Sequence, residues 1–195
     1  EGPGSFLQAV IKYREKFGYD IKNDKMLSIT IHPERGKHIH MGKKFLNYYK
    51  KNYPTLIKPH KTFTIKTADR YKSRDNGDIT KLKTIELFRK DFGKKFADLV
   101  TADGGFKWDD ENYQEQEAYM LILGEIITGL RVQAKDGSFV LKIFECFTTL
   151  TLKMIYVLTS FYEKAYIYKP FFSRNSNSER YVVCKGFKYD QNTSI

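Results

Sequence analysis

Segments with the pattern of β-strands alternate with segments of helical periodicity along most of this chain, and the alternation stops before the last two strands. Such alternation is typical of an α/β fold, in which helices pack on both faces of a mostly parallel sheet. No helical segment separates the strands expected at 165–168 and 181–184. These two strands should therefore pair as an antiparallel hairpin at one edge of the sheet.

Apolar periodicity gives the bounds of the expected elements. Helices are expected at 5–18, 81–92, 111–135 and 149–162, and further strands at 27–31, 63–66, 96–102 and 138–144. The longest helix should end at Asp136-Gly137. Its expected apolar face consists of Tyr119, Ile122, Leu123, Ile126, Ile127 and Leu130.

The chain of 195 residues has a formal net charge of +11, and its length suggests one domain. Such a charge favours a polyanionic partner, of which nucleic acid is the obvious example, although it could also serve solubility alone. Cys146 and Cys184 lie in apolar surroundings and should be free thiols. No apolar run is long enough to span a membrane. No metal-ligand spacing appears, and the histidines should be solvated loop residues: His32, His38, His40 and His60.

Three charged residues lie at or within the predicted strands, where a buried charge is costly unless it is paired. Asp103 ends one strand, Lys142 interrupts another, and Glu179 precedes the last. Because ligands bind at the carboxyl ends of parallel strands, and the last strand runs backwards, all three should meet at one edge. Each has an ordinary alternative: a turn for Asp103, extension to solvent for Lys142 and a pair with Arg180 for Glu179. Together they are the groups that a proton-transfer site needs.

The segment 37–61 is basic and rich in tyrosine. It could be a solvated face, or a track for an RNA backbone with tyrosines that stack on bases. The aromatic run 161–168, with Phe171 and Phe172, is expected in the core rather than on a base-stacking surface. The candidate RNA contacts are Tyr48, Tyr49 and Tyr53, and three cations, Lys169, Arg174 and Lys185.

Six motifs follow in order: EGPGSF (1–6), GDIT (77–80), ADGGF (102–106), ENYQEQ (111–116), FVLKIF (139–144) and SRNSNSERYVVCKGFK (173–188). Together they resemble the FtsJ-like, Rossmann-fold 2′-O-ribose methyltransferases of RNA, above all the cap-specific mRNA enzymes of eukaryotes and large DNA viruses. The resemblance implies a Rossmann-like methyltransferase domain over 1–188 and a polar tail over 189–195. It also implies a first strand and a lysine before residue 1.

The family uses a Lys-Asp-Lys-Glu tetrad, and the resemblance gives the catalytic roles to Asp103, Lys142 and Glu179. It implies S-adenosylmethionine as the cofactor and no metal. Ser5 stands where the family more often has glycine, and Asn175 replaces a proline. The implied cofactor contacts are Glu1, Gly2, Pro3, Gly4, Ser5, Phe6, Asp78, Ile79 and Asp103. The implied substrate contacts are Asn112, Lys142, Arg174, Ser176 and Glu179.

By this resemblance we expect an enzyme that methylates the ribose 2′-hydroxyl of the first nucleotide of capped mRNA. Two alternatives stay open: the same chemistry on ribosomal or transfer RNA, and an RNA-binding scaffold domain that has lost turnover. The expected partner is RNA, with no membrane. The expected location is the cytoplasm, including a viral factory or virion, with the nucleus as the alternative.

Overall fold

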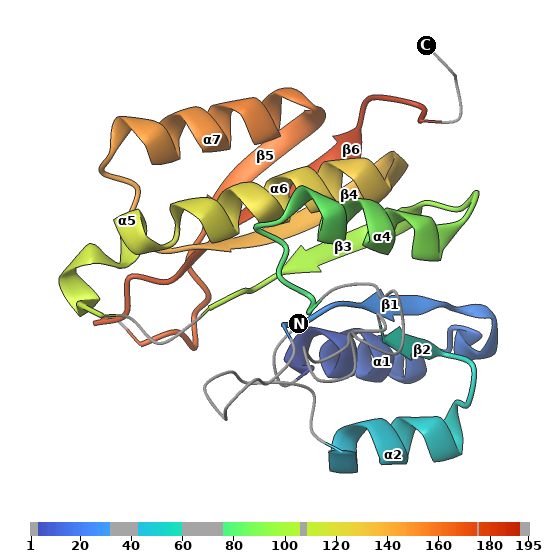
Figure 1. The fold of residues 1–195 in the computed structure, drawn as a ribbon. Coiled ribbons are helices and arrows are strands. Elements are labelled where there is room, and N and C mark those ends of the chain that lie inside the picture. Colours follow the sequence, from blue (N-terminus) through green and yellow to red (C-terminus); the bar gives the residue numbers. More distant parts are fainter. Residues whose placement is uncertain (1–3, 32–42, 60–75, 106–108, 175, 192–195) are drawn as a thin grey trace, which may run out of the picture. The chain divides into compact units, whose positions relative to one another are not determined.

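The computed structural model describes residues 4–31, 43–59, 76–105, 109–174 and 176–191 (Figure 1). The strand expected at 63–66 and all four histidines lie outside these ranges. The chain divides into two compact units, unit 1 (Glu1–Asp91) and unit 2 (Phe92–Ile195). Within the described ranges, no helix is long and apolar enough to cross a membrane.

The described part of unit 1 contains a small parallel sheet and three α-helices. Strands β1 (Met26–Ser28) and β2 (Ile57–Pro59) pair with Met26 opposite Ile57. Helix α1 begins directly after Gly4, whose φ of 92° suits glycine. The helices are α1 (Ser5–Lys16), α2 (Lys43–Asn52) and α4 (Leu82–Phe92), with a short 3₁₀ turn η1 (Ile21–Asn23). Within the described residues, one buried apolar cluster of this unit consists of Ile11, Ile21, Tyr49 and Leu56.

Unit 2 is built on a four-stranded sheet in the order β3-β4-β6-β5. Strands β3 and β4 are parallel, and β6 runs antiparallel to both β4 and β5. The α/β class and the antiparallel pairing of the last two strands are therefore confirmed. The strands are β3 (Ala97–Ala102), β4 (Gln133–Ile143), β5 (Tyr162–Tyr168) and β6 (Arg180–Phe187).

The single helix expected over 111–135 is wrong in its bounds. A 3₁₀ turn η3 (Glu111–Tyr113) and a short helix α5 (Gln114–Glu117) precede α6 (Tyr119–Val132), and β4 already begins at Gln133. Gln133 is fully buried, where its side chain donates to the main-chain oxygen of Ala97 (2.8 Å) and accepts from the Tyr162 hydroxyl (2.9 Å). These bonds satisfy its amide inside the sheet, which local periodicity cannot reveal.

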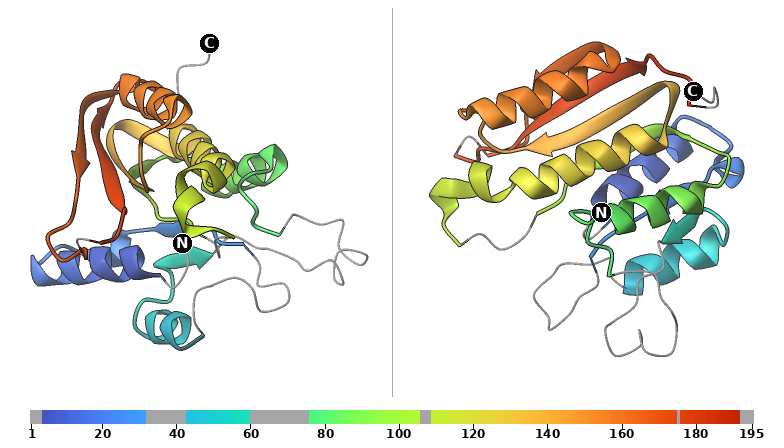
Figure 2. Two further views of the ribbon diagram at one scale, coloured as in Figure 1. Left: turned by 90° about the vertical axis from the view of Figure 1, so that its left-hand side faces the viewer. Right: turned by 45° about the horizontal axis from the view of Figure 1, so that its top comes forward.

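Helices α6 and α7 (Thr149–Ser160) cover one face of this sheet (Figures 1 and 2). Gly129 brings α6 close to the sheet, because a Cβ there would lie 2.5 Å from the Phe139 ring. Leu123, expected on the buried face, is 38% exposed, so the buried stripe is rotated from the expected one. The core includes Ile122, Ile126, Phe139, Leu141, Ile143, Met154, Leu158, Val182 and Cys184.

The strand directions bring four chain segments to one edge of the unit 2 sheet. The ends of β3, β4 and β5 lie there, together with the beginning of β6, since β6 alone runs the other way. In the register, Tyr181 lies opposite both Lys142 on β4 and Tyr168 on β5. This edge therefore carries the groups that follow β3, end β4 and precede β6.

Candidate active site

Lys142 and Asp103 meet at this edge. Phe139, Leu141 and Ile143 alternate along β4 into the core, so Lys142 lies on the other face of the strand. Its Nζ donates to the main-chain oxygen of Asp103 at 2.9 Å and lies 5.6 Å from the Phe144 ring centroid. Lys142 is therefore a half-buried amine anchored to the turn after β3, rather than a side chain that extends to solvent.

The carboxylate of Asp103 does not pair with Lys142. Its Oδ1 is buried and has no hydrogen-bond partner within the described residues. A buried carboxylate oxygen without a partner is costly, because it has lost water and gained nothing in return. The arrangement fits a ligand that brings a donor or a positive charge to this oxygen.

Glu179 stands at the start of β6, at the base of the loop between β5 and β6. Its main-chain oxygen accepts a hydrogen bond from Lys169 Nζ (2.9 Å), and its carboxylate accepts from Asn177 Nδ2 (3.3 Å) and from the Tyr181 hydroxyl. Lys169 also donates to the main-chain oxygen of Asn177. Glu179 forms no ion pair with Arg180, which instead donates to the Ser178 carbonyl (2.9 Å). The local bonds fix the Glu179 backbone.

Tyr181 connects the acidic groups of the site and was missed by the sequence reasoning. Its pKa is raised by burial, by its hydrogen bond to Glu179 and by the charges of Glu179 and Asp103. Asp103 and Glu179 therefore act on the hydroxyl of a residue that lies opposite Lys142 in the sheet. The signal was available, because Tyr181 follows Glu179 by two residues at the beginning of the expected strand.

Glu125 on α6 is a second residue that the sequence reasoning missed. It is only 5% exposed, and its Oε1 accepts the main-chain N–H of Gly104 at 2.7 Å. Burial raises the pKa of Glu125 to about 7, against the Gly104 hydrogen bond and the positive charge of Lys142, which lower it. An acid within the apolar run YMLILGEIITGL was the available signal.

Apart from Lys142 on β4, the predicted substrate contacts lie on two segments at the same edge. Asn112 is exposed, and both its main-chain N–H and its side chain bond to Asp110 Oδ1. The Ser178 hydroxyl donates to Gln114 Oε1 (3.2 Å), which joins the loop before β6 to the segment that contains Asn112. Arg174 and Ser176 on that loop are exposed, whereas the replaced proline position, 175, lies outside the described residues.

The predicted cofactor contacts before residue 80 belong to unit 1. Glu1, Gly2 and Pro3 lie outside the described residues, while Ser5 and Phe6 form the first turn of α1. Asp78 makes a tight turn, since its Oδ1 accepts from the main-chain N–H (3.0 Å) and hydroxyl (2.7 Å) of Thr80. Ile79 lies within this turn and is half-buried. The assigned roles of these residues remain predictions.

Several residues expected to contact RNA are buried or bonded within the protein, so these predictions are wrong. Tyr49 is buried in the core of unit 1, and the Tyr53 hydroxyl donates to Glu15, whereas Tyr48 is exposed. Lys169 is bound to the loop carbonyls described above, so it does not extend freely from the surface. Phe171 and Phe172, expected in the core, are 89% and 96% exposed. Their rings pack edge to face, with 5.5 Å between the ring centroids.

Comparison with known proteins agrees with this architecture. The family model for FtsJ-like methyltransferases matches residues 1–187. Cap-specific mRNA (nucleoside-2′-O-)-methyltransferase 1 of Mus musculus is 41% identical over 118 residues, which are 58% of this chain and 14% of that protein. The protein of the same name from Trypanosoma brucei brucei is 39% identical over 113 residues, covering 57% of this chain and 30% of that protein. The chain thus corresponds to less than a third of either relative's length.

Among solved structures, a putative ribosomal RNA methyltransferase from Plasmodium falciparum is similar with a TM-score of 0.48. It is 16% identical in sequence, and the superposition covers 92% of this chain and 95% of that one.

Proposed function

The chain belongs to the FtsJ-like methyltransferase family, and from that premise we propose that it transfers a methyl group from S-adenosylmethionine to a ribose 2′-hydroxyl of RNA. The observation that carries the proposal is the meeting of Asp103, Lys142 and Glu179 at one sheet edge, with Lys142 held on the Asp103 main chain. The mouse and trypanosome relatives are named as cap-specific mRNA methyltransferases. We therefore propose capped mRNA as the substrate.

The buried, unpartnered Oδ1 of Asp103 fits the cofactor, since S-adenosylmethionine carries both an ammonium group and a cationic sulfur. The cofactor would supply an activated methyl group, and its sulfur would keep the electron pair of the broken bond. Asp103 would hold it at the edge of the unit 2 sheet.

Lys142 would take the proton from the 2′-hydroxyl, because a ribose hydroxyl is a weak nucleophile until it loses its proton. The Asp103 carbonyl holds the Lys142 amine by one hydrogen bond. The other bonding positions of the Lys142 nitrogen stay available for the substrate. Glu179, fixed by its contacts with Asn177 and Tyr181, would orient the ribose at the other side of the lysine.

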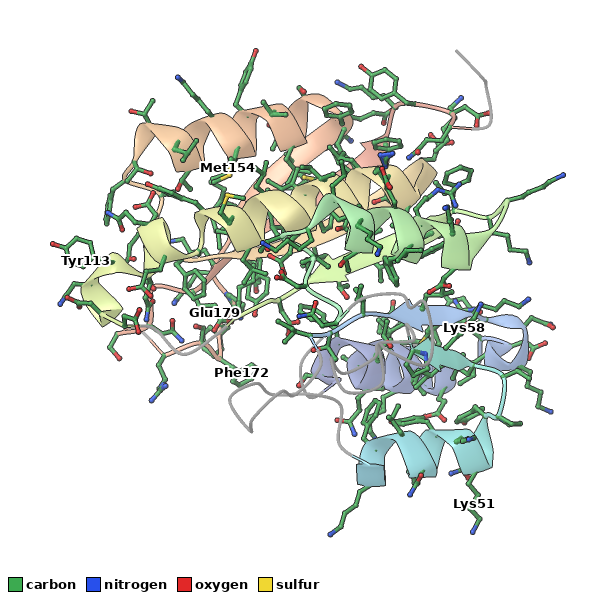
Figure 3. All side chains as sticks on the ribbon, in the orientation of Figure 1. Lys51, Lys58, Tyr113, Met154, Phe172 and Glu179 are labelled. Atoms are coloured by element: carbon green, nitrogen blue, oxygen red, sulfur yellow. The ribbon has the colours of Figure 1, made fainter. Side chains whose placement is uncertain are left out.

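The substrate RNA would also contact the loop between β5 and β6. This loop carries the exposed Phe171–Phe172 pair and the exposed Arg174 (Figure 3 labels Phe172 and Glu179 on it). Exposed aromatic rings bind single-stranded bases by stacking, and a nearby guanidinium binds the phosphates. The loop ends at Glu179, so a strand of RNA bound there would lead its ribose to the proposed base.

The test is transfer of tritium from methyl-labelled S-adenosylmethionine to a short RNA with or without a cap, followed by digestion and identification of the labelled nucleoside. We expect a 2′-O-methyl nucleoside from capped RNA. Lys142→Ala should reduce transfer at least about 100-fold. Lys153→Ala, which removes an exposed lysine of α7, should not reduce it.

Each alternative gives a different result. Equal transfer to uncapped ribosomal or transfer RNA would favour the second class of substrate. RNA binding without S-adenosylmethionine binding in a calorimeter would favour a scaffold domain. Transfer that survives in Lys142→Ala would refute the assignment of the base.

A further inference from the structure

The peptide group between Asp103 and Gly104 is bonded at both of its ends. Its carbonyl oxygen accepts from Lys142 Nζ at 2.9 Å, and its N–H donates to Glu125 Oε1 at 2.7 Å. The cation therefore lies at the negative end of the peptide dipole and the carboxylate at the positive end. Hydrogen bonds to charged groups are stronger than neutral ones, so this arrangement fixes the orientation of one peptide plane.

The turn is also in close contact with α6 through its missing side chain. A Cβ on Gly104 would lie 2.6 Å from Glu125 Oε1 and 3.0 Å from Leu121 Cδ2. The same construction on Gly105 meets its nearest described atom, Lys142 Nζ, at an ordinary 3.8 Å. Gly104 is thus the point where the turn presses on the helix, and Glu125 is the side chain beneath it.

The burial of Glu125 at this position costs free energy. It is 5% exposed on an otherwise apolar helix, and the Gly104 N–H is its hydrogen-bond partner in the described part of the chain. A leucine would suit the surrounding core better, since a buried acid costs free energy that an apolar side chain does not. A role in the site accounts for an acid that packing does not require.

From these contacts we propose that Glu125 is a positioning residue for Lys142, which it holds in place through the Asp103–Gly104 peptide. The inference rests on the proposed function, because it assigns Lys142 as the group whose position matters. Glu125 itself touches neither substrate nor cofactor. If the hydrogen bond from the Gly104 N–H to Glu125 is lost, the Asp103–Gly104 peptide can rotate. The Asp103 oxygen then moves away from Lys142 Nζ.

Three variants separate this role from simple packing. Glu125→Leu removes the acceptor, Glu125→Gln keeps an acceptor oxygen and removes the charge, and Thr128→Val is the matched control. Thr128 is buried on the same helix, and its hydroxyl donates to the Gly124 carbonyl of that helix. We expect Glu125→Leu to lower kcat at least about tenfold with KM for S-adenosylmethionine changed less than about twofold. Glu125→Gln should restore most of kcat, and Thr128→Val should match the wild type.

A spectroscopic readout makes the test independent of turnover. In wild-type protein, the Gly104 amide resonance should shift as Glu125 titrates, and Glu125→Gln should abolish that shift. Among the described residues, the charges that act on Glu125 are those of Lys142 on β4 and Asp103 on the turn, so the Lys142 Nζ resonance should change as Glu125 titrates. Lys142→Arg identifies that resonance.

The two possible failures give different results. If wild-type protein transfers no methyl group, the proposed function fails, and the resonances still report whether Glu125 holds the turn. The positioning role is overturned if Glu125→Leu keeps wild-type kcat. It is also overturned if the Lys142 Nζ resonance stays unchanged while the Gly104 amide moves. If Glu125→Leu does not fold, the Gly104 amide and Lys142 Nζ resonances of the wild type and of Glu125→Gln decide between these results.

Discussion

At the residue scale, Gly104 and Gly105 are neighbours with different tolerance for a side chain. A methyl group on Gly104 would meet Glu125 and Leu121 within 3.0 Å, whereas one on Gly105 would have 3.8 Å to its nearest described neighbour. Overpacking of this kind costs about 1–3 kcal/mol. We predict that Gly104→Ala lowers the free energy of unfolding by that amount and reduces methyl transfer. Gly105→Ala should leave stability nearly unchanged. Urea denaturation of both variants is the measurement, and equal stability would contradict the prediction.

Glu125 also predicts how stability depends on pH. Its pKa is raised by burial from 4.5 to about 7, so the unfolded chain ionises at lower pH than the folded one. Its contribution to stability is therefore complete below pH 4.5 and is lost as the pH rises through 7. We expect Glu125→Gln to gain stability relative to wild type over this range, by about 3 kcal/mol at most. Urea denaturation of both proteins at pH 5 and pH 8 measures this gain. The same stability difference at both pH values would refute the prediction.

The sequence could predict the residues of the site that lie at strand ends, and not those that reach it from elsewhere. Asp103, Lys142 and Glu179 follow from strand direction, since parallel strands end at the same edge. Glu125 comes to the turn from a helix 21 residues further along the chain. The apolar run around Glu125 indicates a buried acid, but its contact with Gly104 is a tertiary property that the sequence does not reveal.

At the element scale, Glu115 ties the short helix α5 to the beginning of α7. It is 4% exposed and accepts hydrogen bonds from the main-chain N–H (2.9 Å) and hydroxyl (2.7 Å) of Thr148 and from the Phe147 N–H (3.2 Å). Thr148 is the N-cap of α7. Burial would raise the pKa of Glu115, but hydrogen bonds from Thr151, Thr148 and Phe147 outweigh it and lower the pKa.

Removal of this carboxylate should destabilise unit 2. Glu115→Ala leaves the N–H groups of Phe147 and Thr148, just before and at the N-cap of α7, without their acceptor, at an expected cost of about 2 kcal/mol. Because the folded pKa is lowered, this contribution is present at neutral pH and fades as the pH falls below 4.5. Gln116→Ala, an exposed neighbour on α5, is the control and should cost little. Denaturation at pH 7 and pH 3 tests the prediction, which fails if Glu115→Ala costs as much in acid as at neutrality.

The bounds of elements were predicted well where apolar periodicity ended at a clear signal. Helix α4 and strand β3 differ from the expected ranges by one residue at their beginnings and agree at their ends. The beginning of β4 was missed because Gln133 and Ala134 continue a helical pattern. Pairing of Gln133 with Ala97 of β3 overrides that local preference, and a pairing between distant residues has no signature in a local window.

At the scale of the whole molecule, the net charge of +11 and the aromatic loop suggest two separable contributions to RNA binding. Phosphate contacts weaken with salt because binding releases counterions, while base stacking is far less sensitive. The sequence predicted the charge but not the loop, since Phe171 and Phe172 carry the hydrophobicity expected of core residues. Both rings are exposed on the loop that Lys169 closes through its bonds to the carbonyls of Asn177 and Glu179.

The two contributions should respond differently to mutation. Phe171→Ala with Phe172→Ala should weaken binding of single-stranded RNA by about 1–3 kcal/mol for each base that is no longer stacked, by a similar factor at every salt concentration. Arg174→Ala should instead lower the slope of log affinity against log salt by about 0.7, the value for one phosphate contact on a single strand. Tyr156→Ala on α7, also a strongly exposed aromatic, is the control and should change neither quantity. Fluorescence anisotropy over a range of salt concentrations measures both. If the phenylalanine variant changes the slope but not the affinity at high salt, the rings do not stack on bases, and the loop contributes only through its charge.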